Sequence, residues 1–111
     1  MSEATPVSMI IIPKKFMKPS IIALRMKGEN MEPTVNDQGV VGVDREDDEI
    51  VSGKIYAIWV PNEGIVLKRL FIEPDKVVLK SDNPLFPGSS VSLKEIGDFL
   101  IGRAKWVVQA L

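Results

Sequence analysis

Short runs of β-branched and aromatic residues, separated by residues that favour turns, limit how this chain can fold. Valine, isoleucine and aromatic side chains favour an extended backbone, whereas glycine, proline, asparagine and aspartate favour turns. Their spacing predicts a mostly β fold, with twisted antiparallel sheets in a sandwich or barrel-like arrangement. The predicted strands are Ile21–Met26, Gly39–Asp44, Lys54–Val60, Ile65–Phe71, Lys76–Lys80 and Phe99–Val108.

The segment KIYAIWVPNEGIVLKRLF, which covers residues 54–71, predicts a β-hairpin. Pro61 presets the φ angle of a turn, and Gly64 permits a φ that other residues rarely adopt. The runs on either side of PNEG are therefore expected to pair as neighbouring strands.

The length and composition of the chain predict one compact domain with a single core. A chain of 111 residues with 45% hydrophobic residues buries about 60–65% of its unfolded surface. The first twenty residues mix proline, lysine and a short apolar run, which is typical of a linker. We therefore expect residues 1–20 to be an arm from an upstream domain and residues 21–111 to be the folded domain.

The charge and the missing residue types exclude several classes of function. With 14 basic and 15 acidic residues the net charge is −1, so the chain should not bind DNA well alone. The absence of cysteine and histidine removes disulfides, thiolate and imidazole metal ligands, and Ser-His catalytic pairs. We predict no metal and no cofactor, and a catalytic base would have to be a lysine or a carboxylate. The acidic run Asp44–Glu49 lacks the spacing and the central glycine of a calcium loop, so we expect a solvated loop.

No apolar run in the sequence approaches the roughly 20 residues needed to cross a bilayer. The longest runs, Met9–Ile12 and Ile21–Leu24, are much shorter, and no signal-peptide pattern opens the chain. We therefore expect a soluble protein without a membrane partner, located in the bacterial cytoplasm.

A turn and a strand lysine form the candidate chemical site. The turn is GENMEPT, residues 28–34, with Asn30 at the position that such a frame would use to present a side chain. The lysine is Lys68, which lies among the apolar residues Leu67 and Leu70. Desolvation disfavours the charged ammonium, so a buried lysine can act as a general base, as in a Ser-Lys dyad.

Several motifs carry a family resemblance. GENMEPTV, GVVGVDR, VSGKIYAIWV, IVLKRL, VVLKSDNPLFP and IGRAKWV follow one another between Met26 and Val108. Together they resemble the C-terminal domain of LexA, UmuD and the lambda-type phage CI repressors. The resemblance implies a LexA-like, mostly β fold with a serine in a Gly-x-Ser-Met-x-Pro-Thr turn and a lysine in a Val-x-Lys-Arg-Leu strand. It also implies self-cleavage of an upstream peptide, and Lys68 matches the position of the base.

Asn30 departs from this pattern at the position of the nucleophile. A carboxamide has no ionisable proton that Lys68 could remove, so we expect self-cleavage to be absent and the dyad positions to be vestigial. The family's usual scissile pairs, Ala-Gly and Cys-Gly, do not occur before Asn30. Two explanations stay open: a replacement made by an experimenter, or a natural repressor that does not cleave itself, of the coliphage 186 CI kind. We favour the natural one, because alanine is the usual laboratory choice.

Both site residues also have purely structural interpretations. Asparagine tolerates left-handed turn geometry and bonds to local backbone, so Asn30 suits a turn without any catalytic history. A strand lysine can pack its stem on apolar neighbours and extend its head to water. The motif context favours a buried Lys68 head, with the Asn30 side-chain oxygen as its hydrogen-bond partner.

Apolar residues in two segments predict a self-association surface. The loop SDNPLFP contains two apolar residues between prolines, and the terminal segment FLIGRAKWVVQAL is expected to form an edge strand, which invites pairing with a second chain. In the resembled family the C-terminal strands form the dimer contact. The candidate interface residues are Leu85, Phe86, Ile101, Trp106, Val107, Val108 and Leu111.

The resemblance and the replaced serine together indicate a phage or bacterial transcriptional repressor. This domain would form homodimers and larger oligomers, while operator DNA would be read by a missing N-terminal helix-turn-helix domain. Without self-cleavage, release from the operator would require another event, such as binding of an antirepressor protein. The alternative is a self-cleaving Ser-Lys protein of the LexA or UmuD kind with its serine replaced. Signal peptidase shares a related turn, but the missing membrane segment opposes that interpretation.

Overall fold

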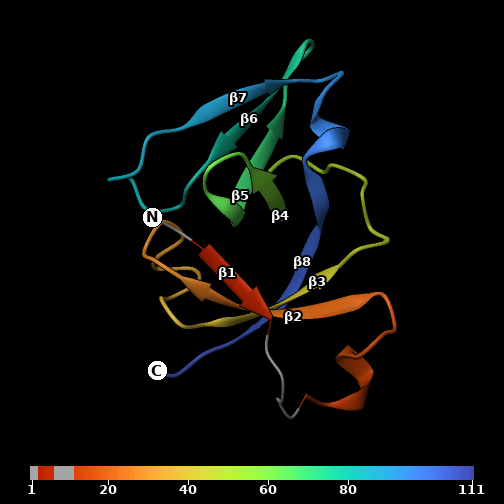
Figure 1. The fold of residues 1–111 in the computed structure, drawn as a ribbon, viewed down its shortest axis with the longest axis vertical. Coiled ribbons are helices and arrows are strands. Elements are labelled where there is room, and N and C mark those ends of the chain that lie inside the picture. The colour runs from red at the N-terminus through yellow and green to blue at the C-terminus, as the bar shows by residue number, and fades with distance from the viewer. Residues whose placement is uncertain (1–2, 7–11) are drawn as a thin grey trace.

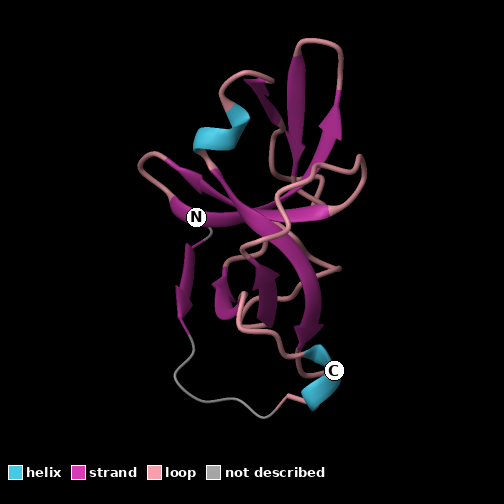
Figure 2. Cartoon of the chain, turned by 90° about the vertical axis from the view of Figure 1, so that its right-hand side faces the viewer, coloured by secondary structure: helices cyan, strands magenta, loops and turns pink. Residues whose placement is uncertain are grey.

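The structure is a computed structural model that describes residues 3–6 and 12–111. It is dominated by strands, with two short turns of 3-10 helix, η1 (Lys14–Phe16) and η2 (Ile96–Asp98) (Figure 2). The predicted mostly β fold is confirmed. The strands are β1 (Glu3–Pro6), β2 (Ile21–Lys27), β3 (Val40–Asp44), β4 (Ile55–Val60), β5 (Gly64–Ile72), β6 (Lys76–Lys80), β7 (Ser89–Ser92) and β8 (Leu100–Val108).

The described strands form one twisted antiparallel sheet in the order β1-β2-β3-β8-β4-β5-β6-β7 (Figure 1). Each of the six strands predicted from the sequence is present, and its ends agree to within one residue. The sequence did not reveal β1, which lies inside the predicted arm, or β7, whose SSVS sequence carries a single apolar residue. Both are four-residue strands at the edges of the sheet.

The prediction that the last strand is an edge strand is wrong. β8 lies between β3 and β4, and it pairs with both. Gly102 makes this position possible, because a Cβ atom there would lie 2.1 Å from the carbonyl oxygen of Asp44 on β3. Whether a strand lies at the edge or in the centre of a sheet depends on which distant segments pair with it. The composition of β8 does not reveal these partners.

Two clusters of buried side chains divide the interior of the domain. Side chains alternate between the faces of a strand, so Ala57 and Leu67 enter the first cluster while Tyr56 and Val66 enter the second. The first cluster consists of Leu24, Met26, Met31, Val35, Val41, Val43, Ala57 and Leu67. The second consists of Tyr56, Ile58, Val66, Leu70, Val77, Leu79 and Ile96.

The predicted hairpin joins these two clusters and is confirmed. β4 and β5 pair from Val60 opposite Gly64 back to Ile55 opposite Arg69. The turn contains a hydrogen bond of 3.0 Å from the Glu63 amide to the Val60 carbonyl. Gly64 has a φ of 82°, as its place in the turn predicted.

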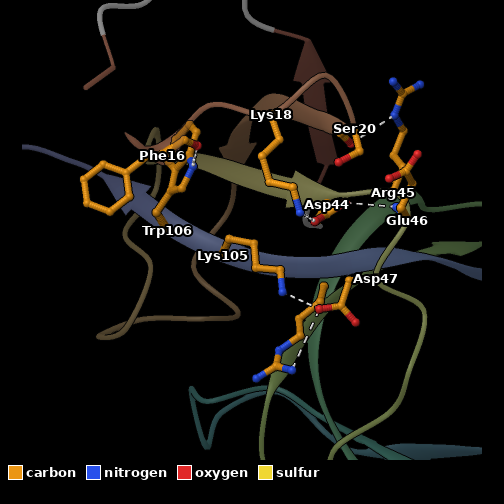
Figure 3. A network of polar contacts seen from close by, with 10 residues as sticks. Phe16, Lys18, Ser20, Asp44, Arg45, Glu46, Asp47, Lys105 and Trp106 are labelled. Atoms are coloured by element: carbon orange, nitrogen blue, oxygen red, sulfur yellow. Dashed lines mark hydrogen bonds and ion pairs between the residues drawn. The ribbon is translucent and has the colours of Figure 1, made fainter. Parts of the chain in front are cut away.

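The described part of the predicted arm contacts the folded domain. β1 pairs with β2, and the indole Nε1 of Trp106 donates a 3.0 Å hydrogen bond to the carbonyl of Phe16 in η1 (Figure 3). Lys18 forms a 3.1 Å ion pair with Asp44 at the end of β3. Residues 1–2 and 7–11 of the predicted arm lie outside the described residues.

Candidate functional site

The turn that carries Asn30 connects β2 to β3 and is held at both ends. The Gly28 amide donates a 2.8 Å hydrogen bond to Asp37 Oδ1, and the Val35 amide donates one of 2.9 Å to the Met31 carbonyl. Met31 and Val35 are buried in the first cluster. The side chains of Met31 and Val35 therefore anchor the turn to the first cluster and fix the position of Asn30.

Asn30 is buried, with 5% of its surface exposed, and links three segments. Its Nδ2 donates a 3.1 Å hydrogen bond to the carbonyl of Leu67 on β5. The backbone carbonyl of Asn30 accepts a 2.9 Å hydrogen bond from the backbone amide of Asn83. The carboxamide thus lies against the strand that carries Lys68, so the two site residues predicted from sequence are brought to the same part of the fold.

Lys68 lies on the face of β5 that also carries Val66 and Leu70, and it extends toward the second cluster. Its side chain is partly buried, and Nζ donates a 2.9 Å hydrogen bond to the hydroxyl of Ser81. Burial lowers the pKa of the Lys68 ammonium from 10.5, while the negative charge of Glu63 acts in the opposite direction. A lowered pKa makes the neutral amine, which is the form that can accept a proton, easier to reach.

The loop that follows β6 supplies site residues that the sequence did not point out. Asp82 accepts hydrogen bonds of 2.8 and 2.6 Å from Nε and Nη2 of Arg69, and one of 2.6 Å from the Thr34 hydroxyl. The Arg69 guanidinium is the main reason that the pKa of Asp82 is lowered. Asn83 Nδ2 donates a 2.9 Å hydrogen bond to the Glu29 carbonyl. The loop therefore ties the Asn30 turn to β5.

The sequence carried a weak signal for this connection. Asp82 and Asn83 stand in the dipeptide before Pro84, where side chains commonly bond to nearby backbone. The actual partners lie 13 to 54 positions away, so only the fold identifies them.

A cleft of about 360 Å³ opens beside Lys68. Lys68 and Glu63 are the charged residues that line it, and most other lining residues are apolar. The large apolar residues at its walls include Ile58, Trp59, Leu79, Phe86, Ile96 and Phe99. An apolar cleft with one amine of lowered pKa can hold a non-polar segment and accept a proton, which supplies the base for acyl chemistry but not the nucleophile.

The acidic run Asp44–Glu49, which begins at the last residue of β3, differs from the solvated loop expected from sequence. Asp44 is 2% exposed, so that expectation is wrong for its first residue. The nearby Ser20 hydroxyl is the largest contribution that lowers the pKa of Asp44 to about 2. The Glu46 amide and Lys18 act in the same direction, whereas burial opposes them. Asp47 forms an ion pair with Lys105 (Figure 3). Its Oδ2 also lies 3.9 Å from Nη1 of Arg103.

Within residues 3–6 and 12–111, no three histidine, cysteine or acidic residues are grouped so that they could hold a metal ion. In the same part of the chain, no helix is long and apolar enough to cross a membrane.

The candidate interface residues fall into two groups. Ile101 packs against the first cluster, Phe86 lines the cleft, and the Trp106 indole is half-buried. A Cβ atom on Gly42 would lie 2.1 Å from the Trp106 indole, so the indole packs directly on the backbone of Gly42. The exposed members are Leu85, Val107, Val108 and Leu111.

The antiparallel fold, the NMEPT turn and the strand lysine beside a cleft are the features that the LexA-like resemblance implies for this domain. A family model described as Peptidase S24-like matches residues 2–103, and the chain belongs to this family. The LexA repressor of Pseudothermotoga lettingae is 33% identical over 81 residues, which cover 70% of this chain and 40% of that protein. The resemblance to the LexA and UmuD type of domain is thereby confirmed, and the chain spans less than half the length of that relative.

Proposed function

We propose that this domain joins the subunits of a transcriptional repressor and does not cleave itself. The observation that carries the proposal is the carboxamide of Asn30, in the family's turn and beside the strand of the family's lysine. The role of the domain would then be to hold the repressor subunits together, as expected for a phage repressor of the coliphage 186 CI kind.

The chemistry of Asn30 supports the loss of cleavage. The nitrogen lone pair of a carboxamide is delocalised into the carbonyl group, and the side chain has no proton that Lys68 could remove. Nδ2 is also engaged as a donor to the Leu67 carbonyl. Asn30 therefore acts as a structural link between the turn and β5, and for self-cleavage the dyad positions Asn30 and Lys68 are vestigial.

The end of β8 supports self-association. β4 pairs with β8 as far as Arg103, and from Ala104 to Val108 the described pairing is with β3 alone. Val107 and Val108 are 39% and 45% exposed in this stretch, and Leu111 follows them on the surface. A second copy that covers these side chains would bury apolar area and could use the strand edge.

Pairing of subunits would serve DNA binding by another part of a longer protein. The net charge of −1 gives this domain no general attraction to phosphate, so operator DNA would be contacted by an N-terminal reading domain. Joining two readers makes the second contact intramolecular and raises the apparent affinity. Release in the bacterial host cytoplasm would then depend on a partner such as an antirepressor protein rather than on cleavage.

Sedimentation across a wide concentration range tests the assembly function. We expect a dimer, and larger species at high concentration, and we expect Val108→Asp to shift the equilibrium toward monomer. Val51→Asp is the matched control, because Val51 is also exposed, at 38%, but lies in the loop before β4. A strict monomer at concentrations of hundreds of micromolar, or equal effects of the two variants, would contradict the proposal.

A self-cleaving protein with a replaced serine is the second candidate, and the retained Lys68 with its lowered pKa favours it. The test is Asn30→Ser in a protein that includes an upstream cleavage segment. Cutting that rises with pH and disappears in the additional variant Lys68→Ala would establish that the remaining machinery is intact. An uncut protein would favour the non-cleaving repressor.

A further inference from the structure

We propose that Ser81 and Lys68 form a hydroxyl–amine pair that takes an acyl group from an activated ester in the cleft. The proposal assigns a nucleophile outside the turn of Asn30, and it does not depend on self-association. Its basis is the 2.9 Å hydrogen bond between Lys68 Nζ and Ser81 Oγ.

The backbone on both sides of this pair is well held. In the β5–β6 ladder Arg69 lies opposite Lys80, so Lys68 and Ser81 occupy the next positions beyond it. The neighbouring residues, Arg69 and Asp82, are joined by two hydrogen bonds of 2.8 and 2.6 Å. A rigid support of this kind keeps the hydroxyl and the amine within proton-transfer distance.

The surroundings of the pair suit a lysine base. Lys68 lines the apolar cleft, and burial lowers its pKa, although Glu63 opposes the effect. Ser81 is half-buried and therefore not sealed from small reagents. Lys68 lines the cleft and Ser81 lies next to it, so an ester in the cleft would have to reach Ser81 Oγ past the Lys68 amine. Apolar walls favour an ester over a charged substrate.

The reaction is ordinary acyl transfer. Neutral Lys68 Nζ removes the proton from Ser81 Oγ while Oγ forms a bond to the acyl carbon of the ester. The bond from that carbon to the leaving oxygen then breaks with its electron pair, and the leaving group departs as an alcohol or phenolate. Lys68 passes the proton to the leaving group or to water, which leaves an acyl ester on Ser81 that water can hydrolyse.

The test uses p-nitrophenyl acetate, because an activated ester needs little stabilisation of its oxyanion. The intact chain is treated across a pH series, and peptide mapping by mass spectrometry quantifies the acetyl group at Ser81. Ser90, which is exposed on β7, is the internal reference in the same samples. We expect Ser81 to be labelled about 100-fold faster than Ser90, which is the scale of general-base catalysis. The rate should rise with pH and level off below 10.5, because the neutral amine is required and its pKa is lowered.

Three variants separate the base from a merely structural contact. Ser81→Ala should remove the label, Ser81→Thr should retain part of it, and Lys68→Met should reduce labelling of Ser81 to the level of Ser90. Thermal unfolding by circular dichroism shows that each variant is folded before its rate is compared. Labelling of Ser81 at the rate of Ser90, an unchanged rate in Lys68→Met, or acetylation of Lys68 in place of Ser81 would overturn the proposal.

Discussion

The contact between Asp82 and Arg69 gives the sharpest test of how the site is built. Asp82→Asn keeps the size of the side chain but removes its charge and replaces one of the two oxygens that accept hydrogen bonds from Arg69 and Thr34. The side chains of Arg69 and Asp82 are 30% and 14% exposed, so water screens the interaction only in part. Hydrogen bonds to charged groups contribute about 1.5–3 kcal/mol each when buried, and partial exposure reduces this. We expect a loss of about 1–3 kcal/mol in the free energy of unfolding at neutral pH.

The effect should depend on pH with a defined sign. The pKa of Asp82 in the folded state is below 3.8, mainly because of Arg69. A carboxyl group with a lowered folded pKa contributes stability above its unfolded pKa and loses it as pH falls through the folded value. Asp82→Asn should therefore differ from the parent chain at pH 7 and approach it as pH falls below 3.8.

Urea unfolding at pH 7 and at a series of acidic values measures this difference. Asp75→Asn is the matched control, because Asp75 is an exposed aspartate in the turn between β5 and β6. The loss at pH 7 corresponds to a fall of roughly 4–12 °C in Tm for a domain of this size. A cost that stays constant from pH 7 to acid, or an equal cost for Asp75→Asn, would refute the argument from Arg69.

Three further changes probe the packing around the site. Gly42→Ala places a Cβ 2.1 Å from the Trp106 indole, so urea unfolding should show a loss of about 1–3 kcal/mol, while Gly97→Ala, in open space, should be nearly neutral. Tyr56→Phe leaves two backbone groups of the preceding loop without the phenol that bonds them at 2.7 and 2.8 Å, and should cost about 1–3 kcal/mol in the same assay. Asp44→Asn should destabilise the chain above pH 3.8 and lose this effect as pH falls toward 2, because the pKa of Asp44 is lowered to about 2. Equal unfolding midpoints for Asp44→Asn and the parent chain at pH 7 would contradict that reasoning.

The site shows how far local sequence reasoning reaches. Residues 28–34 and the lysine strand could be recognised because a turn and a strand each leave a short signature. The clamp of Arg69 and Asp82 and the contact of Lys68 with Ser81 could not be derived in this way. Each contact joins residues 13 positions apart, and many other pairings of the same polar side chains are compatible with the sequence.

The sequence by itself determined the six main strands, the hairpin at Pro61–Gly64 and the carboxamide at position 30, because strand periodicity, turn chemistry and residue identity are local properties. Only the tertiary structure decided that β8 lies inside the sheet, that Asp44 is buried and that a serine hydroxyl meets the Lys68 amine. These outcomes depend on which distant segments pair when the two clusters are buried, and close approaches such as that of Gly102 to Asp44 select among the possible pairings.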